Sequence, residues 1–248
     1  FTSLGLMSGT SLDGVDISVV KSDGFNHVEV IFNDYVEFDK NLYSELTDLR
    51  EKISKLEDLN NFLKKIDQIE KKFTIFNSII VKKVIEENSF KIDLIGFHGQ
   101  TILHLPKNKI SKQIGEGSLL SFLTKCKVVS KFRQMDLDSG GQGAPLAPIY
   151  HNQLSKIINN KFKLNYPMSI INIGGITNVS KILNEKNLEK NLFAYDIAPG
   201  NCLIDLWIRK HSGKKFDHNG DLAKCGKVDN LILNQAIDNF EICSIDNF

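Results

Sequence analysis

The chain has 248 residues, of which 42% are hydrophobic and 25% are charged. This is the usage of a globular protein and excludes a disordered, collagen-like or coiled-coil one. The 31 basic and 30 acidic residues leave a net charge of +1, which gives no indication of nucleic-acid binding. No apolar run approaches the ~20 residues that span a bilayer, and the first residues are not typical of a signal peptide. We expect a soluble intracellular protein with one large domain or two small ones.

The first ninety residues predict three strands followed by a long helix. Residues 1–7 and 15–21 are expected strands around a polar turn at 8–14, and residues 28–38 form a third. Short connections of this kind indicate antiparallel pairing. Ser54 and Glu57 have the spacing of a capping box, and apolar residues then recur with a helical period from Leu56 to Val84. We expect one helix over this segment.

From residue 92 onward, strands and helices alternate. The expected strands are 92–97, 127–129, 169–173 (a buried one), 179–183 and 193–197, and the expected helices are 118–124, 149–158 and 201–211. This alternation is typical of the α/β class. Because the chain starts inside an expected strand and stops without a closing element, we expect it to be a fragment of a longer protein.

Four loops that contain glycine each follow an expected strand, at residues 7–14, 97–101, 138–145 and 172–178. Strand ends in α/β sheets converge on one crevice, so several such loops can build one site. Glycine lets backbone N–H groups approach phosphate oxygens, and the hydroxyls of Thr10, Ser11 and Thr177 would add donors. Neither of the common glycine-rich nucleotide motifs occurs. Any one of these loops could be a plain tight turn, which is a weaker explanation for all four.

Two carboxylates, Asp13 and Asp16, flank the first loop. In a phosphate site, such carboxylates hold Mg²⁺ directly or through water. The alternatives are an Asx turn before Gly14 for Asp13 and an exposed strand position for Asp16. The sequence favours a metal role for the pair and leaves the alternatives open.

Further polar residues follow other expected strands. Asp136 is expected at a strand end beside a glycine-rich loop, where it could act as a general base, with Arg133 orienting it or contacting substrate. The alternative is a surface ion pair of little energetic value. His98 and Gln100 could donate hydrogen bonds to a polyhydroxyl ligand, and a satisfied core histidine is the alternative for His98.

Five motifs occur in a fixed order, at residues 5–16, 96–101, 132–146, 172–178 and 196–205. With these motifs, the chain closely resembles the anhydro-N-acetylmuramic acid kinase family of the actin, heat-shock ATPase and sugar kinase superfamily. The resemblance covers essentially the whole chain. It implies a ribonuclease H-like, actin-type ATPase fold in the α/β class, with two lobes at residues 1–130 and 131–248. Each lobe would contain a mixed sheet, and the second lobe would be incomplete.

The resemblance also implies an activity. The family uses ATP and water to open 1,6-anhydro-N-acetylmuramic acid, and it produces N-acetylmuramic acid 6-phosphate and ADP in peptidoglycan recycling and amino sugar catabolism. The implied cofactors are ATP and Mg²⁺, the partners are the sugar and ATP, and the location is the cytoplasm. Neither nucleic acid nor a membrane is expected as a partner, and a homodimer is left open.

The same resemblance assigns roles to residues. Asp136 would be the catalytic base, and Asp13 and Asp16 would bind the metal. The sugar would be bound by His98, Gln100, Thr101, Arg133 and Gln142. The ATP site would consist of Gly9, Thr10, Ser11, Leu12, Asp13, Gly14, Val15, Asp16, Gly174, Gly175 and Asn178.

One carboxylate is sufficient for this chemistry, because the γ-phosphoryl group can capture the leaving oxygen that a glycosidase would have to protonate. Two other functions stay open. One is a kinase of the same superfamily with another substrate, which the segment 132–146 disfavours. The other is a nucleotide-binding module without turnover. Lys131, where the family usually has Asp, and the expected lack of the C-terminal region favour it, whereas the intact Asp13, Asp16 and Asp136 oppose it.

Overall fold

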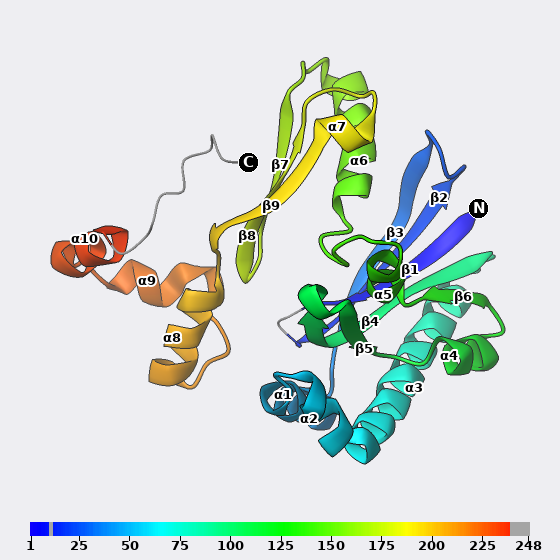
Figure 1. The fold of residues 1–248 in the computed structure, drawn as a ribbon, viewed down its shortest axis with the longest axis horizontal. Helices are drawn as coiled ribbons and strands as arrows, with labels where there is room; N and C mark the ends of the chain where they lie inside the picture. The colour runs from blue at the N-terminus through cyan, green and yellow to red at the C-terminus, as the bar shows by residue number, and fades with distance from the viewer. Residues whose placement is uncertain (10–11, 239–248) are drawn as a thin grey trace. The chain divides into compact units, whose positions relative to one another are not determined.

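The computed structural model describes residues 1–9 and 12–238. These residues form two compact units. The first comprises residues 1–171 and 179–195, and the second comprises 172–178 and the chain from 196 onward. In both units helices accompany β-sheet (Figure 1), so the α/β class is confirmed.

The first unit is built on a six-stranded mixed sheet with the order β3-β2-β1-β4-β5, in which β6 pairs with β4. The strands are β1 (Thr2–Ser8), β2 (Gly14–Ser22), β3 (Val28–Glu37), β4 (Leu94–Leu105), β5 (Ile110–Ile114) and β6 (Lys127–Ser130). β2 pairs antiparallel with β1 and β3, as expected, and so does β5 with β4. β4 is parallel to β1 and β6. The sequence did not indicate β5.

Helices cover both faces of β4. The helices between residues 40 and 162 are α1 (Lys40–Lys52), α2 (Leu56–Asn61), α3 (Leu63–Asn88), α4 (Gly117–Thr124), α5 (Phe132–Asp138) and α6 (Pro148–Phe162), with a 3-10 turn η1 (Pro106–Asn108). Phe73 of α3 stacks on Phe97 at 6.0 Å between ring centroids. A side chain on the preceding Gly96 would meet Phe132 of α5 at 3.7 Å. Since neighbouring strand residues point to opposite faces, α3 and α5 lie on opposite sides of β4.

The expectation of one helix from Leu56 to Val84 is wrong, because the helix breaks at Phe62, whose φ of −113° and ψ of 15° are not helical. Phe62 packs its ring against the core, so tertiary burial overrides the helical period. The expected capping box of Ser54 and Glu57 does not form, because the N-cap residue is Lys55, whose side chain cannot accept a hydrogen bond. Asp58 Oδ2 instead accepts from the backbone N–H groups of Ser54 and Lys55, at 3.0 and 3.1 Å.

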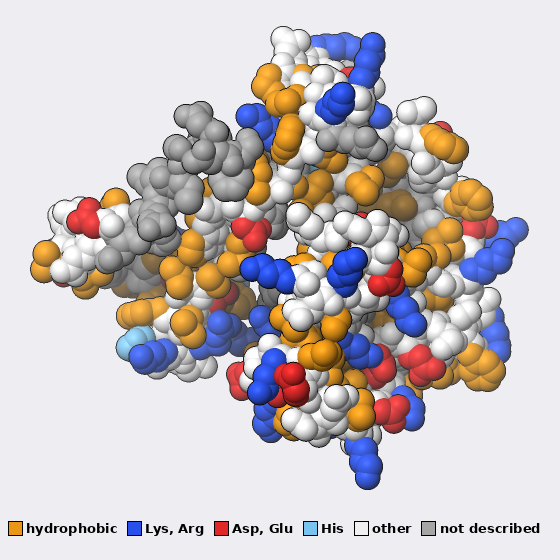
Figure 2. All heavy atoms as spheres, viewed as in Figure 1, with side chains coloured by type: hydrophobic (Ala, Val, Ile, Leu, Met, Phe, Trp, Pro, Cys, Tyr) orange, Lys and Arg blue, Asp and Glu red, His pale blue; other side chains and the backbone are white. Residues whose placement is uncertain are grey.

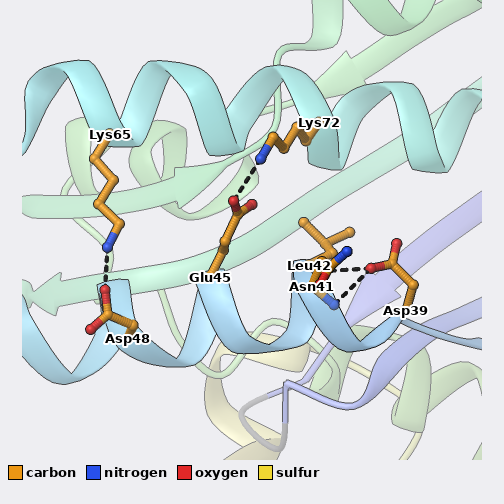
Figure 3. Close-up of polar contacts among 7 residues, drawn as sticks. All are labelled: Asp39, Asn41, Leu42, Glu45, Asp48, Lys65 and Lys72. Carbon is orange, nitrogen blue, oxygen red and sulfur yellow. Dashed lines mark hydrogen bonds and ion pairs between the residues drawn. The ribbon is translucent and has the colours of Figure 1, made fainter.

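Helix α1 was not predicted, and it joins the core through three buried leucines, Leu42, Leu46 and Leu49. Figure 3 shows its polar edge against α3: Lys72 contacts Glu45 at 2.6 Å, and Lys65 forms an ion pair with Asp48. Such exposed pairs contribute little stability. The buried leucines therefore hold α1 in place, and the ion pairs add alignment with α3.

A second sheet contains β7 (Met168–Ile173), β8 (Ile176–Ile182) and β9 (Leu192–Pro199), in that order. This sheet is antiparallel, so the prediction of a mixed sheet in the second lobe is wrong for these strands. The reason is that consecutive strands are joined by reversing connections, residues 174–175 between β7 and β8 and residues 183–191 between β8 and β9. β7 is also not the buried strand expected, since Ile171 and Ile173 are exposed. The remaining elements are α7 (Leu188–Asn191), α8 (Cys202–Ser212), η2 (His218–Gly220), α9 (Asp221–Cys225) and α10 (Asn230–Asp238).

The surface carries interspersed charges. On the face drawn in Figure 2, lysines and acidic residues are scattered among hydrophobic side chains. Within residues 1–9 and 12–238, no helix combines the length and apolar character needed to cross a membrane.

The cap of α1 gives a stability prediction. Asp39 Oδ1 accepts hydrogen bonds from the backbone N–H groups of Asn41 and Leu42, both at 2.9 Å. Asp39→Ala should lower the free energy of unfolding by about 1 kcal/mol, because two helix-end donors lose their acceptor. Asp39→Asn should stay within a few tenths of a kcal/mol. Urea unfolding measures both, and equal losses in the two variants would contradict the capping role.

Candidate active site

A bulge in β4 organises the candidate site. Residues 98–101 were expected in a loop, but β4 continues through them to Leu105. The strand exchanges partners at this point: Phe97 pairs with Leu6 of β1, whereas Gln100 pairs with Ser8 of β1 and with Ile114 of β5. One residue of β1 therefore opposes two of β4, His98 and Gly99, and the strand turns with Gly99 at a φ of +74°. A side chain at Gly99 would meet the carbonyl oxygen of Ile114 at 2.4 Å, so only glycine fits.

His98, in the bulge, holds Arg133 of α5. Arg133 Nε donates to His98 Nε2 at 2.8 Å. Because guanidinium can only donate, Nε2 must accept, and the ring proton then sits on Nδ1. Nδ1 lies 2.7 Å from the carbonyl oxygen of Gly99, to which it donates. Burial lowers the pKa of His98, the hydrogen bond to the Gly99 oxygen offsets part of this, and the charge of Arg133 lowers the pKa further, so that it lies below its ordinary value. The structure thus favours a neutral His98 that fixes the guanidinium.

Asp136 follows Arg133 by one helical turn, and glycine backbone surrounds its carboxylate. The Gly143 N–H donates to Asp136 Oδ2 at 2.7 Å, and the Gly141 N–H donates to the backbone oxygen of Asp136 at 2.8 Å. A Cβ on Gly141 would lie 2.1 Å from Asp136 Oδ2. The glycine-rich loop therefore folds back onto the half-buried carboxylate. Asp136 lies within helix α5 and not directly at the strand end expected for it, because Lys131, in the left-handed region, lets the helix start at once after β6.

Gln134 anchors the same helix to β5. Its Oε1 accepts from Ser111 N at 2.9 Å, and its Nε2 donates to the carbonyl oxygen of Lys109 at 3.0 Å. Ser111 Oγ in turn lies 3.0 Å from His104 Nδ1. A Cβ on Gly143 would approach the His104 ring to 3.1 Å. These contacts fix α5 and its glycine loop to the sheet edge, so Arg133 and Asp136 project from a supported helix.

The loop after β1 lies beside the bulge. Gln100 Nε2 donates to the carbonyl oxygen of Gly9 at 3.0 Å, and Leu12 N donates to the same oxygen at 3.4 Å. The side chains of Leu12 and Val15 lie in the core, so of these two residues only the backbone can face a ligand. Thr10 and Ser11 lie outside the described residues. Three of the four expected loops are thus connected by contacts within the first unit.

The two aspartates lie at the start of β2 with a tyrosine from β3. Tyr35 pairs with Asp16 in the sheet, and its hydroxyl donates a hydrogen bond to Asp13. Burial and the charges of Asp13, Glu37 and Asp16 raise the pKa of Tyr35 to about 12. Partial burial raises the pKa of Asp16, and the charge of Asp13 raises it further. The cluster is a region of negative potential that a cation would relieve.

The carboxylates suit Mg²⁺ bound together with phosphates. Within residues 1–9 and 12–238, no group of three or more His, Cys, Asp or Glu side chains is arranged to hold a metal ion. Mg²⁺ characteristically takes one or two protein carboxylates and completes its shell with water and substrate phosphates. Asp13 and Asp16 fit that pattern, and they do not form a protein-only metal site.

Other expected residues lie apart from these contacts or in the second unit. Thr101 Oγ1 accepts from Gln113 Nε2 at 3.3 Å, and Gln142 is exposed. In the second unit, Gly174 and Gly175 form the turn between β7 and β8, and Asn178 is half-buried in β8. The Asn201 N–H donates to the Gly174 oxygen at 2.7 Å, so a hydrogen bond links this turn to the residue that precedes α8.

Sequence reasoning missed Tyr35, Gln134 and His104. The signal for Tyr35 was available, because the antiparallel register of β2 and β3 places it opposite Asp16. Gln134 and His104 act across elements distant in sequence, and β5 itself was not predicted. Only the folded sheet edge brings them to α5.

The mixed sheet with helices on both faces and its glycine-containing loops are consistent with a sugar kinase-type α/β protein. The model of the family "Anhydro-N-acetylmuramic acid kinase" matches residues 2–241. Curated relatives with that name come from Pelagibacter ubique (48% identical over 241 residues, 97% of this chain and 63% of the relative) and Agrobacterium fabrum (40% over 237 residues, 92% and 60%). The chain belongs to the anhydro-N-acetylmuramic acid kinase family. It spans 60–63% of the length of these relatives.

The His98–Arg133 contact predicts a pH dependence. Since the pKa of His98 in the folded protein is below its ordinary value of 6.5, the unfolded chain takes up the proton first as the pH falls. Stability should therefore decrease below about pH 6.5. His98→Gln keeps an acceptor for Arg133 but cannot titrate, so it should lose less stability than the wild type between pH 7 and pH 5.

Thermal unfolding across that pH range measures the difference. The substitution of His27, an exposed histidine in a turn, by Gln controls for the amino-acid change itself. Parallel pH profiles for wild type and His98→Gln would contradict the neutral, acceptor role of His98.

Proposed function

We propose that this protein phosphorylates 1,6-anhydro-N-acetylmuramic acid at O6 while water opens the anhydro bridge, with ATP as the phosphoryl donor. The observation that carries the proposal is the placement of Asp136, one turn after a fixed arginine and within a cradle of glycine backbone. Membership of the family supports the substrate. The product would be N-acetylmuramic acid 6-phosphate, formed in the cytoplasm during peptidoglycan recycling and amino sugar catabolism.

In this reaction Asp136 accepts a proton from water, whose oxygen attacks C1 of the sugar. The bond from C1 to the bridging oxygen breaks, and that oxygen, now O6, takes the γ-phosphoryl group of ATP. The bond between the γ-phosphorus and the β,γ-bridging oxygen breaks in the same transfer, and ADP leaves. A glycosidase needs a second carboxyl group to protonate the leaving oxygen. Transfer of the phosphoryl group to the leaving oxygen removes that need. A single base, Asp136 with its hydrogen bond from the Gly143 N–H, is then sufficient.

The neighbouring side chains would bind the sugar. Arg133 presents a guanidinium whose Nε is already held by His98, so its remaining N–H groups are oriented for acceptors on the substrate. A fixed donor loses little entropy on binding, and its charge strengthens each hydrogen bond. Thr101 and Gln142 complete the proposed sugar-binding set, whereas the Gln100 side chain is buried and bonded to the Gly9 oxygen.

The phosphate groups would lie at the loop that follows β1. Residues 9–16 supply backbone N–H groups, and Asp13 and Asp16 would hold Mg²⁺. When bound, Mg²⁺ supplies positive charge to the phosphoryl oxygens. In the second unit, Gly174, Gly175 and Asn178 would form a further phosphate loop. Two ribonuclease H-like lobes of the actin type, divided at residues 130 and 131, are the proposed framework.

A nucleotide-binding module without turnover is the second candidate. The observation that favours it is Lys131, which lies directly before α5 at a φ of +61°. A positive charge at a helix N-terminus is electrostatically unfavourable. Lys131 puts one where the family usually has the negative charge of Asp, so it adds to the positive potential beside Arg133 instead of balancing it. The two candidates differ in whether a phosphorylated sugar is formed.

The test is mass spectrometry of the products formed from the anhydro sugar, Mg-ATP and heavy-oxygen water by the full-length protein. We expect a 6-phosphorylated sugar with one heavy oxygen at C1. Asp136→Asn should reduce this product by about 10²–10⁴-fold, because the proton acceptor is lost, and nucleotide affinity should stay nearly unchanged. Asp138→Asn, on the same helix, is the matched control. Near-normal turnover in Asp136→Asn would refute the base assignment.

A metal prediction concerns Asp16. Asp16→Asn should raise the Mg²⁺ concentration needed for half-maximal turnover by about tenfold, because one carboxylate ligand or water acceptor is removed. Asp34→Asn, an exposed carboxylate on β3, is the control. An unchanged Mg²⁺ requirement in Asp16→Asn would count against this role.

A further inference from the structure

Gln100 is the most deeply buried polar residue in the bulge, and its side chain points toward the loop that follows β1. Its exposed fraction is 1%. Its Nε2 lies 3.0 Å from the Gly9 oxygen and 3.5 Å from the Thr101 oxygen, which leaves Gly9 as the stronger contact. The pairing of Gln100 with Ser8 places it at the end of β1. A side chain carried by the fourth strand thus supports a loop that begins at the first.

This loop needs support, because its backbone includes an unfavourable conformation. Leu12 has a φ of +60°, a region that costs energy for a residue with a Cβ. Such a residue persists only where its surroundings hold it. The described contacts that hold it include the burial of Leu12 in the core, the bond from Phe38 N to the Asp13 oxygen at 2.9 Å, and the Gln100 contact to Gly9.

The Gln100 contact differs in kind from the other two. The Leu12 and Asp13 contacts fix the end of the loop against β2, β3 and the core. Gln100 fixes the beginning, at the oxygen that also accepts from Leu12 N. Without it, the Gly9 oxygen would keep only the longer bond of 3.4 Å from Leu12 N, and the beginning of the loop would be held less firmly.

We propose that Gln100 is a positioning residue for the nucleotide loop: its carboxamide, placed by the bulge at Gly99, holds the Gly9 carbonyl and thereby presets the loop for the phosphates. This rests on the proposed function, and it assigns Gln100 to the nucleotide side in place of the sugar contact expected from the sequence. The same bulge then positions groups for both substrates. His98 fixes Arg133 on the sugar side, and Gln100 fixes the loop on the nucleotide side.

The second polar atom of Gln100 suggests how the contact can be tested. Among the described residues, Gln100 Oε1 is buried without a hydrogen-bond partner. A buried acceptor of this kind costs free energy, so its replacement by an apolar group offsets part of the stability lost with the bond to Gly9. Methionine has a similar shape and lacks both the Nε2 and the Oε1 atoms. Gln100→Met should therefore fold and lose only the hydrogen bond to the Gly9 oxygen.

The first experiment measures binding to the full-length protein by calorimetry, with a non-hydrolysable ATP analogue plus Mg²⁺ and, separately, with the anhydro sugar. We expect Gln100→Met to raise the dissociation constant of the nucleotide about three- to tenfold, the effect of one neutral hydrogen bond, and to leave that of the sugar within about twofold. Gln113→Met, which removes donors to Ser111 and Thr101 but makes no contact to Gly9, is the control. Weaker sugar binding with unchanged nucleotide binding would overturn the proposal.

The second experiment needs no ligand and separates this proposal from the proposed function. Hydrogen exchange at the Leu12 amide should be faster in Gln100→Met than in the wild type and unchanged in Gln113→Met. Unchanged exchange in Gln100→Met would overturn the positioning role. A wild type that binds no nucleotide would refute the proposed function. Faster exchange in Gln100→Met would in that case still support the hydrogen bond from Gln100 as the contact that fixes Gly9.

Discussion

The steric fit at Gly99 is the constraint on which the candidate site depends. Because an added Cβ would lie 2.4 Å from the Ile114 oxygen, β4 can pass from β1 to β5 only with glycine at this position. The bulge inserts one residue and changes the strand's partners without ending it. As a result, two flanking side chains on one strand reach different elements, His98 toward α5 and Gln100 toward the loop after β1.

Glycine plays a second part around Asp136. The space that a side chain on Gly141 would need is filled by the carboxylate of Asp136, and the Gly143 N–H donates to that carboxylate. A base that must act on water needs a fixed position and a surrounding shell that does not itself react. Backbone N–H groups meet both needs, and helix α5, anchored to β5 by Gln134, supplies the rigid support.

Much of the fold could be predicted from local patterns. The first two hairpins, the strand at 127–129 and the helices near 118, 149 and 201 follow from apolar periodicity and turn residues. Helix α1 was missed because its stability comes from three leucines buried against other elements, such as Leu46. The helix break at Phe62 was missed for a similar reason, since the ring is drawn into the core against the helical period.

The sequence by itself determined the family, the glycine loops and the residues that carry charge, because motif order and residue type are written in the chain. The tertiary structure alone decided what these residues touch. In the folded protein residues 98–101 form a bulged strand, Arg133 donates a hydrogen bond to His98, and Gln100 donates one to the Gly9 oxygen. The physical reason is that these contacts join residues 35 and 91 positions apart in the sequence. Strand pairing and helix packing decide which distant residues meet, and no local sequence pattern specifies that.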